Sequence, residues 1–326
     1  MGDEVGIMYP KPANGPRSAP SRSGCFTVAR GDWIAESPPF ESLEELSEAF
    51  GAEGDCATFL EQLRFPRGFV CPRCECRQRP WRTGMGLLAC PGCRHPWVLT
   101  EGTPFHGSRI PLRRWFTAVW SWLEHEQGLD APAFAALLGI EDEAQARGYL
   151  AQLRDLMGVE TIKLHGEVRL ASAKLQLRAE DEQVTPVIMA LEHRAEQMPR
   201  LRLRVLNRSS AGEVMRFAAD VIEPGSLVVT PPWKGLGNLS EIGLLHTMRA
   251  SQIDGPHRLD PSQVWSLIRL WLWGQPDRRA RPSLLVDELV FRFNHRHVGT
   301  GAAWNALMRR MVASESAALD LYEAVG

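Results

Sequence analysis

The sequence lacks any apolar run long enough to cross a membrane, since a spanning helix needs about 20 consecutive, mostly apolar residues. Its first residues, Met-Gly-Asp-Glu, also lack the basic and then apolar order of a secretory signal peptide. With 326 residues, of which 44% are hydrophobic, the chain can still bury a sizeable core. We therefore expect a globular cytoplasmic protein without a membrane partner.

A surplus of positive charge is missing as well. The formal net charge is −2 at pH 7 and the pI is about 6.5, whereas proteins that bind nucleic acids are usually basic. Any contact with DNA must therefore come from local basic patches. The sequence also contains no phosphate-binding loop and no nucleophile elbow, so we expect no small-molecule substrate.

Cysteine is present in a pattern that is typical of a zinc site. Cys71 and Cys74 form one Cys-x-x-Cys pair, and Cys90 and Cys93 form another after fifteen intervening residues. Two such pairs can hold one tetrahedral Zn²⁺ between two short turns, and because protein fills all four positions the predicted site is structural. Two disulfides are the alternative, but they suit a small secreted protein.

Other cysteines and one histidine lie near these pairs. Cys76 and His95 are close enough in sequence to replace a neighbouring ligand, so that exchange stays open. Cys56 lies on the apolar face of a predicted helix, where a small buried hydrophobe is the usual role. Unpaired thiols of this kind fit a reducing compartment.

Composition and periodicity divide the chain into segments. Residues 1–40 are rich in Pro, Gly and Ser, which predicts a flexible leader. The segments predicted after it are short helices at 41–66, the zinc ribbon at 67–104, a helical region at 109–158, a mixed α/β core at 161–300 and a C-terminal helix at 301–326.

The helical region has the spacing of a helix-turn-helix, with helices at Asp130–Leu138 and Glu141–Leu156 and a turn at Gly139-Ile140. The second helix begins with three acidic residues, which disfavours contact with phosphates, and a hairpin of this size often serves packing alone. Both interpretations stay open. The candidate DNA-binding residues here are Arg113, Arg114, Gln145, Arg147, Gln152 and Arg154.

The core segment begins with a period of two, which predicts an antiparallel meander of strands at Thr161–Ala171, Val184–Leu191 and Leu201–Leu206. Three arginines alternate along the third strand as a candidate basic stripe for DNA: Arg200, Arg202 and Arg204. The later elements are predicted at Ser209–Ile222 (helix), Ser226–Thr230 (strand), and Pro261–Trp273, Leu284–Asn294 and Ala302–Tyr322 (helices). This order is the one expected of a ribonuclease-H-like core.

Several segments together resemble a known family. The most specific is Asp287-Glu-Leu-Val-Phe-Arg-Phe-Asn-His-Arg296, and the others include Gly68-Phe-Val-Cys71-Pro-Arg-Cys74, Pro111-Leu-Arg-Arg-Trp-Phe116, Trp233-Lys-Gly235 and Trp265-Ser-Leu267. In this order they resemble the ISXO-type insertion-sequence transposases, relatives of the Merlin elements. The resemblance implies an α/β fold, with an N-terminal zinc ribbon and a helix-turn-helix-like region followed by a ribonuclease-H-like mixed-sheet domain with a DDE acid triad.

The positions of those three acids hold other residues in this chain. In the family's register, Ala171 replaces the first Asp, Pro231 the second, and Ser262 the third acid. Two Mg²⁺ ions need carboxylate oxygens on rigid elements, which these side chains do not offer. Glu167 lies about 13 Å from Ala171 along an extended strand, too far to replace the first acid. Asp260 is explained as the N-cap of a helix.

The sequence therefore predicts a protein of the DNA-transposition lineage that has lost its DDE acids and acts as a non-cleaving DNA-binding protein, with structural Zn²⁺ and without Mg²⁺. Two alternatives remain. One is an active DDE transposase that catalyses Mg²⁺-dependent DNA strand cleavage and transfer, and the other is a protein scaffold that does not bind DNA. Whether the chain forms a homo-oligomer stays open.

Overall fold

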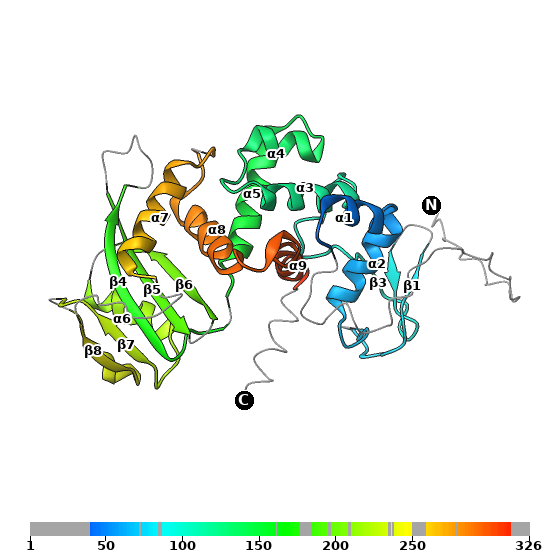
Figure 1. Cartoon of the computed structure of the whole chain (residues 1–326). Helices are drawn as coiled ribbons and strands as arrows, with labels where there is room; N and C mark the ends of the chain where they lie inside the picture. Colours follow the sequence, from blue (N-terminus) through cyan, green and yellow to red (C-terminus); the bar gives the residue numbers. More distant parts are fainter. Residues whose placement is uncertain are drawn as a thin grey trace, which may run out of the picture. The chain divides into compact units, whose positions relative to one another are not determined.

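The computed structural model of the chain (Figure 1) describes residues 40–71, 73–83, 87–160, 162–176, 184–194, 197–207, 210–233, 236, 238–249, 259–277 and 279–313. The leader predicted for residues 1–40 lies outside this part, apart from Phe40. The Phe40 ring is buried, 5.4 Å from that of Phe50 and 6.1 Å from that of Trp304. Phe40 therefore belongs to the packed chain.

Two short helices open the described chain. In α1 (Leu43–Ala49) the Ser42 hydroxyl accepts a hydrogen bond from the Glu45 N–H, which is the N-cap that the sequence predicts. The next helix, α2 (Glu53–Arg64), buries Cys56 on its apolar face. Burial raises the pKa of the Cys56 thiol to about 12, so this cysteine stays protonated and acts as a small hydrophobe.

The ribbon contains a small antiparallel sheet of order β1-β2-β3. Its apolar core is also small, with the rings of Phe69 and Trp97 stacked 5.4 Å apart beside Cys71 and Cys90. The strands are β1 (Trp81–Arg82), β2 (Leu88–Ala89) and β3 (Pro96–Trp97).

Three helices follow the ribbon: α3 (Leu112–Glu124), α4 (Ala131–Leu138) and α5 (Glu143–Gly158). The predicted helix, turn and helix are present in α4 and α5. Gly139 ends α4 in the left-handed region with φ of +67°, a conformation that glycine adopts without a Cβ penalty. The second helix begins two residues later than predicted because Asp142 is its N-cap.

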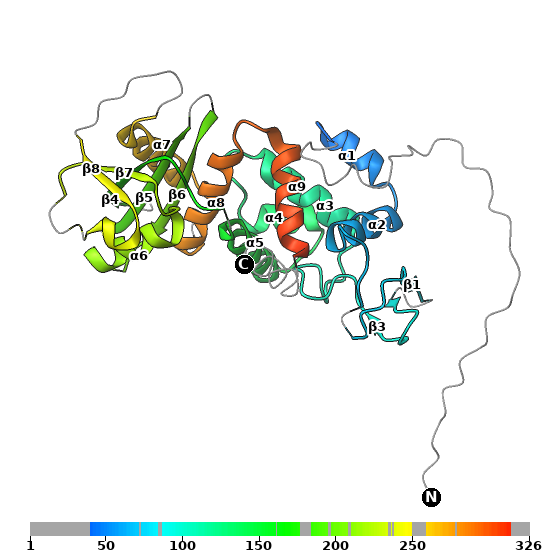
Figure 2. The ribbon, with the colours of Figure 1, turned by 90° about the horizontal axis from the view of Figure 1, so that it is seen from below.

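The last described helix, α9 (Gly299–Val312), completes the core that α1, α2 and α3 share (Figure 2). Its Trp304 is fully buried and donates a hydrogen bond from Nε1 to the Phe116 carbonyl at 3.1 Å. The helix was predicted at Ala302–Tyr322, and the part beyond Ala313 lies outside the described residues. The rings within 6.3 Å of Trp304 are those of Phe40, Phe50, Phe59, Phe116 and Trp120.

The second half of the chain forms a five-stranded mixed sheet of order β6-β5-β4-β7-β8. Within this sheet β4 pairs antiparallel with β5, and β5 pairs antiparallel with β6. In contrast, β7 is parallel to β4, and β8 is parallel to β7. This topology is consistent with a ribonuclease-H-like domain, and the predicted α/β fold class is confirmed. The strands are β4 (Glu167–Leu175), β5 (Thr185–Arg194), β6 (Gln197–Val205), β7 (Leu227–Thr230) and β8 (Leu245–Met248).

Helices cover both faces of this sheet, because successive side chains of a strand point to opposite faces. On one face α6 (Ala211–Val221) packs against β4 and β5, and on the other α7 (Pro261–Trp273) and α8 (Pro282–His295) do so (Figure 2). The bounds of α7 match the prediction, because Asp260 and Gln263 form the expected capping box. No helix within the described ranges combines the length and the apolar character needed to cross a bilayer.

Two parts of the sheet differ from the sequence prediction. The first strand begins at Glu167 instead of Thr161, because Gly166 turns the chain with φ of +78°. The strand β8 was not predicted. It has four residues, and its ends are exposed, Leu245 by 62% and Met248 by 63%, so it carries no alternation of apolar and polar residues.

Candidate metal centre and nucleic-acid interface

Four thiols of the ribbon converge on one point, since the Sγ atoms of Cys71, Cys74, Cys90 and Cys93 all lie within 4.8 Å of one another. The Sγ of Cys71 is 3.7 Å from that of Cys93, and the Sγ of Cys74 is 3.6 Å from that of Cys90. Disulfide sulfurs would be about 2.05 Å apart. Four sulfurs at about 2.3 Å from a tetrahedral Zn²⁺ lie about 3.8 Å apart. The cysteines thus fit a closed, structural Zn²⁺ site.

The two Cys-x-x-Cys turns share one backbone geometry. Glu75 and Arg94, each directly after the second cysteine of its turn, have φ of +57° and +59°. The Glu75 N–H donates to the Cys71 carbonyl and the Arg94 N–H to the Cys90 carbonyl, both at 2.9 Å. The same turn used twice aims both pairs of thiols at the common centre.

Cys76 and His95 each lie two residues after the second cysteine of a turn, and neither belongs to the cluster of four thiols. Their carbonyl oxygens accept hydrogen bonds from the N–H groups of Cys71 and Cys90, at 3.0 and 3.2 Å. The Cys76 side chain packs against Gly92, where a Cβ would lie 3.1 Å from the Cys76 Cβ. The exchange of ligands that the sequence left open is therefore not needed.

Backbone groups favour the thiolate that zinc requires. Burial raises the pKa of Cys90, whereas the N–H groups of Cys93 and Gly92 and the thiols of Cys71 and Cys74 lower it, to about 6. The same contacts between thiols raise the pKa of Cys74, so within this cluster the negative charge is favoured on Cys90. The Gly92 nitrogen lies 3.3 Å from the Cys90 Sγ. Because a metal ligand must be deprotonated, this turn is prepared for metal near neutral pH.

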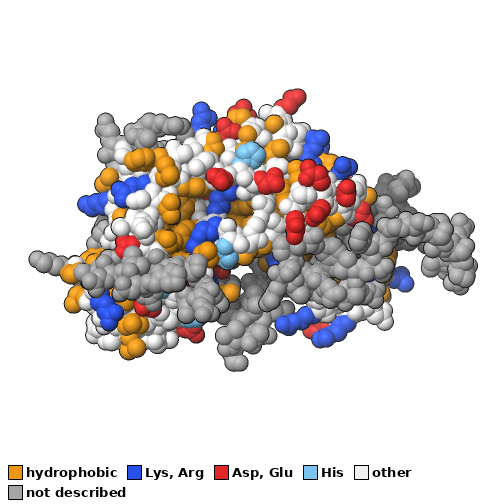
Figure 3. Space-filling view, viewed as in Figure 1, with side chains coloured by type: hydrophobic (Ala, Val, Ile, Leu, Met, Phe, Trp, Pro, Cys, Tyr) orange, Lys and Arg blue, Asp and Glu red, His pale blue; other side chains and the backbone are white. Residues whose placement is uncertain are grey.

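Exposed arginines surround the metal centre. Residues 67–97 contain six arginines and one acid, Glu75, although the whole chain is slightly acidic. Blue side chains of this region are visible at the lower right of Figure 3. The sequence prediction missed them because it weighed the cysteines, whereas a charge count over the ribbon alone would have found them. The exposed arginines are Arg67, Arg73, Arg77, Arg79, Arg82 and Arg94.

Only part of this positive charge is neutralised. Glu61 of α2 lies 3.0 Å from the Arg82 guanidinium and 3.8 Å from that of Arg79. Arg67, Arg77 and Arg94 have no carboxylate partner among the residues that the structure describes. The ribbon is therefore a local basic patch of the kind that contact with phosphates requires.

The candidates of the helical region differ in their availability. Arg113 and Gln145 are exposed, as is Gln152, and Arg147 is half-buried. The Arg114 Nη1 donates to the carbonyl of Leu138 at 3.3 Å and lies where a side chain at position 139 would clash with it. Arg114 thus fastens α3 to the end of α4 although the residue is exposed, and the other candidates offer single polar groups at the surface.

Arg154 is not at the surface, contrary to the prediction that it could read DNA. Its side chain is 1% exposed, with Nε 2.7 Å from a Glu288 oxygen and Nη1 2.5 Å from an Asp277 oxygen. Glu288 is itself fully buried and accepts a second hydrogen bond, from the Arg292 Nε at 2.9 Å. Arg154 therefore joins α5 to α8 and cannot reach a phosphate. Sequence periodicity could not reveal partners more than 120 positions away.

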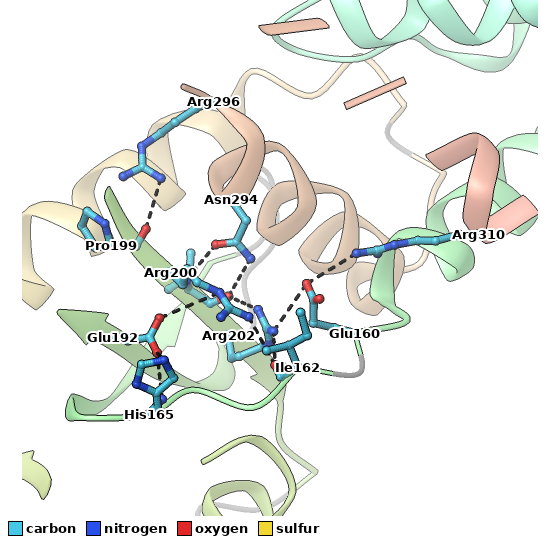
Figure 4. Close-up of polar contacts among 11 residues, drawn as sticks. Glu160, Ile162, His165, Glu192, Pro199, Arg200, Arg202, Asn294, Arg296 and Arg310 are labelled. Atoms are coloured by element: carbon cyan, nitrogen blue, oxygen red, sulfur yellow. Dashed lines mark hydrogen bonds and ion pairs between the residues drawn. The ribbon is translucent and has the colours of Figure 1, made fainter. Parts of the chain in front are cut away.

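The three β6 arginines lie on one face of the strand, as their alternation predicts, but they bind protein groups. Figure 4 shows the contacts of Arg200 and Arg202. Arg202 is 7% exposed, donates from Nη2 to the Ile162 carbonyl at 2.7 Å, and lies 3.4 Å from Glu160. Burial lowers its pKa to about 10. Arg200 donates to the same carbonyl, and Arg204 pairs with an α6 carboxylate at 2.7 Å. Arg200 and Arg202 thus fasten the segment between α5 and β4, and Arg204 binds α6.

The segment of α8 that resembles the transposase family most closely is used for packing. The Asn294 side chain accepts from the Leu201 N–H at 2.8 Å and donates to the Leu201 carbonyl at 3.0 Å, which pairs it with β6 like a further strand residue (Figure 4). The Arg296 guanidinium lies 3.8 Å over the Phe293 ring and donates to the Pro199 carbonyl. These residues dock α8 on the sheet.

Two of the three positions that the resemblance aligns with acids lie on or directly after neighbouring strands. The parallel register of β4 and β7 pairs Arg169 with Val229. Ala171 lies two residues beyond Arg169 on β4, and Pro231 directly follows β7.

The space around Ala171 is apolar. Ala171 is 8% exposed and belongs to a buried cluster with Val264 and Trp265 of α7. The third position, Ser262, lies in the first turn of α7, where its N–H donates to the Asp260 carboxylate at 2.7 Å. Asp260 is therefore the helix cap that the sequence predicts.

Residues 51–96 match the transposase zinc-ribbon domain. The match begins just before α2 and ends at β3, so it covers the metal centre and the exposed arginines and does not reach the five-stranded sheet. No curated protein matches the chain. The chain thus carries a transposase-type zinc ribbon, which points to the insertion-sequence transposases and to DNA as the general class of partner.

Proposed function

We propose that the chain is a DNA-binding protein of the insertion-sequence transposase lineage, whose ribbon contacts the DNA backbone and whose sheet domain does not cleave it. The observation that carries the proposal is the set of exposed arginines on the zinc ribbon. They lie on the part of the chain that matches the transposase zinc-ribbon domain, and four of them, Arg67, Arg73, Arg77 and Arg94, have no carboxylate partner among the described residues.

Charge placement supports contact through the ribbon and not through the sheet. Arginines that face solvent can exchange water and counterions for phosphates, which is the main source of affinity for DNA. Arg154, Arg200 and Arg202 are already bound to protein groups, so moving them to DNA would leave buried carboxylates or carbonyls without partners.

The lack of cleavage is supported by the side chains at the aligned acid positions. Ala171 and Pro231 offer no oxygen for a metal ion, and the cluster around Ala171 excludes the water that a hydrated Mg²⁺ carries. Glu167 lies four residues before Ala171 on β4, and its carboxylate is 3.6 Å from the Arg169 guanidinium, so it does not replace the missing acid. Mg²⁺ is therefore not a cofactor in this proposal.

The binding proposal is tested by titrating labelled duplex DNA with protein at several salt concentrations. Replacing Arg73, Arg77 and Arg94 together with Ala is expected to reduce the slope of log K against log salt by about 2 to 3, because each lost phosphate contact contributes about 0.9. A matched variant replaces three exposed arginines outside the ribbon and should keep the slope: Arg216, Arg249 and Arg269. Equal slopes for wild type and the ribbon variant would contradict contact through the ribbon.

The second test concerns cleavage. Wild-type protein incubated with supercoiled or terminal-repeat DNA and Mg²⁺ or Mn²⁺ is expected to produce no nicks above background, because no aligned position offers a carboxylate. The Cys71→Ser variant, purified in the same way, controls for contaminating nucleases. Metal-dependent nicking by wild type that is absent from Cys71→Ser would support an active transposase instead.

An exposed apolar stripe on α7 favours the protein scaffold as a second candidate. Leu267, Leu270 and Trp273 are 51%, 67% and 47% exposed, and hydrophobic side chains gather over this helix in Figure 3. A second copy of the chain would cover such a stripe in a homo-oligomer. A scaffold alone would give no salt-dependent shift of duplex DNA, so the titration above distinguishes the two candidates.

A further inference from the structure

We infer that Trp81 of β1, which Arg79 and Arg82 flank in the sequence, is a stacking site for an unpaired nucleic-acid base. The inference rests on the proposed function, because it assumes that the ribbon meets DNA, and it adds the form of DNA that the ribbon prefers. The ligand class is single-stranded or locally unpaired DNA, such as a frayed end or a gap.

The exposure of Trp81 is the first observation. The ribbon contains two tryptophans, and Trp97 alone serves the small core, stacked on Phe69. Trp81 is 45% exposed although its strand is paired, with Trp81 opposite the buried Ala89. A large aromatic side chain that is not used for packing and lies in a basic region is typical of a surface that binds bases.

The two neighbouring guanidinium groups are the second observation. Glu61, whose side chain is 15% exposed, lies within ion-pair distance of both Arg79 and Arg82. One carboxylate thus restrains two arginines that flank Trp81 in the sequence, and the three side chains together keep a net positive charge. An exposed aromatic ring in a positively charged region can hold a base while nearby arginines bind the phosphates of the same strand.

The local backbone makes Trp81 a fixed platform. The hairpin that carries it is closed by the Thr83 N–H, which donates to the Leu87 carbonyl at 2.8 Å, and by the Leu87 N–H, which donates to the Thr83 Oγ1 at 3.2 Å. A ring on a closed hairpin loses little freedom when a ligand binds. Bases in a duplex already stack on one another, so this ring can stack only where a base is free.

The experiment compares a short duplex with the same duplex carrying a gap of unpaired thymines, by fluorescence anisotropy of labelled DNA. Trp81→Ala is expected to weaken binding to gapped DNA by roughly tenfold or more and to change duplex binding by less than about twofold. Its salt slope should equal that of wild type, because stacking neutralises no phosphate. Trp81→Phe should retain most of the preference for gapped DNA, and Trp81→Leu should lose it.

Trp273→Ala is the matched control, because Trp273 is 47% exposed on α7. Zinc content equal to that of wild type confirms that a ribbon variant is folded, and if Trp81→Ala loses zinc, the Phe and Leu variants decide. If wild type binds duplex DNA in a salt-dependent way and Trp81→Ala keeps the wild-type affinity for gapped DNA, the stacking site is overturned and the proposed function stands. An equal loss on both DNAs also overturns it, in favour of a groove contact. Failure of wild type to bind either DNA overturns the proposed function itself.

Discussion

Cys71→Ser is expected to abolish stoichiometric zinc binding and to unfold the ribbon, while the five-stranded sheet stays folded. The apolar cluster beside the metal centre is too small to hold the ribbon together alone, since its buried members are Phe69, Cys71 and Cys90. A structural Zn²⁺ contributes about 10–16 kcal/mol to the folding of such small modules. The apolar clusters of the sheet include no ribbon residue.

Zinc content measured by mass spectrometry and limited proteolysis with peptide mapping check this result. Cleavage should concentrate in residues 67–104 and leave a protected fragment that contains the sheet. Cys76→Ser is the matched control, because Cys76 lies beside the tetrad without belonging to it. One zinc ion per chain in Cys71→Ser, or its loss from Cys76→Ser, would mean that the ligand set is wrong.

Arg154→Ala is expected to lower the free energy of unfolding by about 3–5 kcal/mol, the usual cost of leaving buried charges without their partner. The substitution would leave the carboxylates of Asp277 and Glu288, 4% and 0% exposed, without this guanidinium. Because α5 and α8 pack together at this point, the loss falls on the joint between the helical region and the sheet. Urea denaturation followed by circular dichroism measures it.

An exposed ion pair provides the comparison for this variant. Arg204 and Asp220 are 2.7 Å apart with side chains 40% and 49% exposed, and Arg204→Ala should cost less than about 1 kcal/mol. DNA titration separates the two roles that sequence and structure give to Arg154. Unchanged stability with a reduced salt slope would restore it as a DNA contact.

Local sequence signals predicted the elements whose ends are fixed by nearby residues. The start of α7 needed only Asp260, Pro261 and Gln263, and the cysteine spacing alone indicated the metal centre. Elements fixed by distant partners were harder to predict. The strand β8 depends on pairing with β7, and its own four residues are mostly exposed.

The candidate DNA contacts illustrate the same limit. Strand alternation would place Arg202 at a surface, but its contact with Ile162 buries it. Arg154 lies on the face of α5 that Ala146 and Leu150 also share, and there it contacts Glu288. Whether an arginine is free depends on residues far away in the chain, whereas the ribbon arginines stay exposed because the module around them is too small to bury them. In this chain the net charge of the whole ribbon predicts exposed arginines better than the arginines counted along one helix or strand.

The position of Trp304 has a consequence for synthesis on the ribosome. The helices α1, α2 and α3 leave the ribosome before α9, and the ring that completes their shared core lies 188 positions after Phe116. Until α9 emerges, the apolar faces of the first helices have no final partner, and the nascent chain is exposed to aggregation or chaperone capture. The sheet can pair its strands sooner, so we expect the middle of the chain to fold before its beginning.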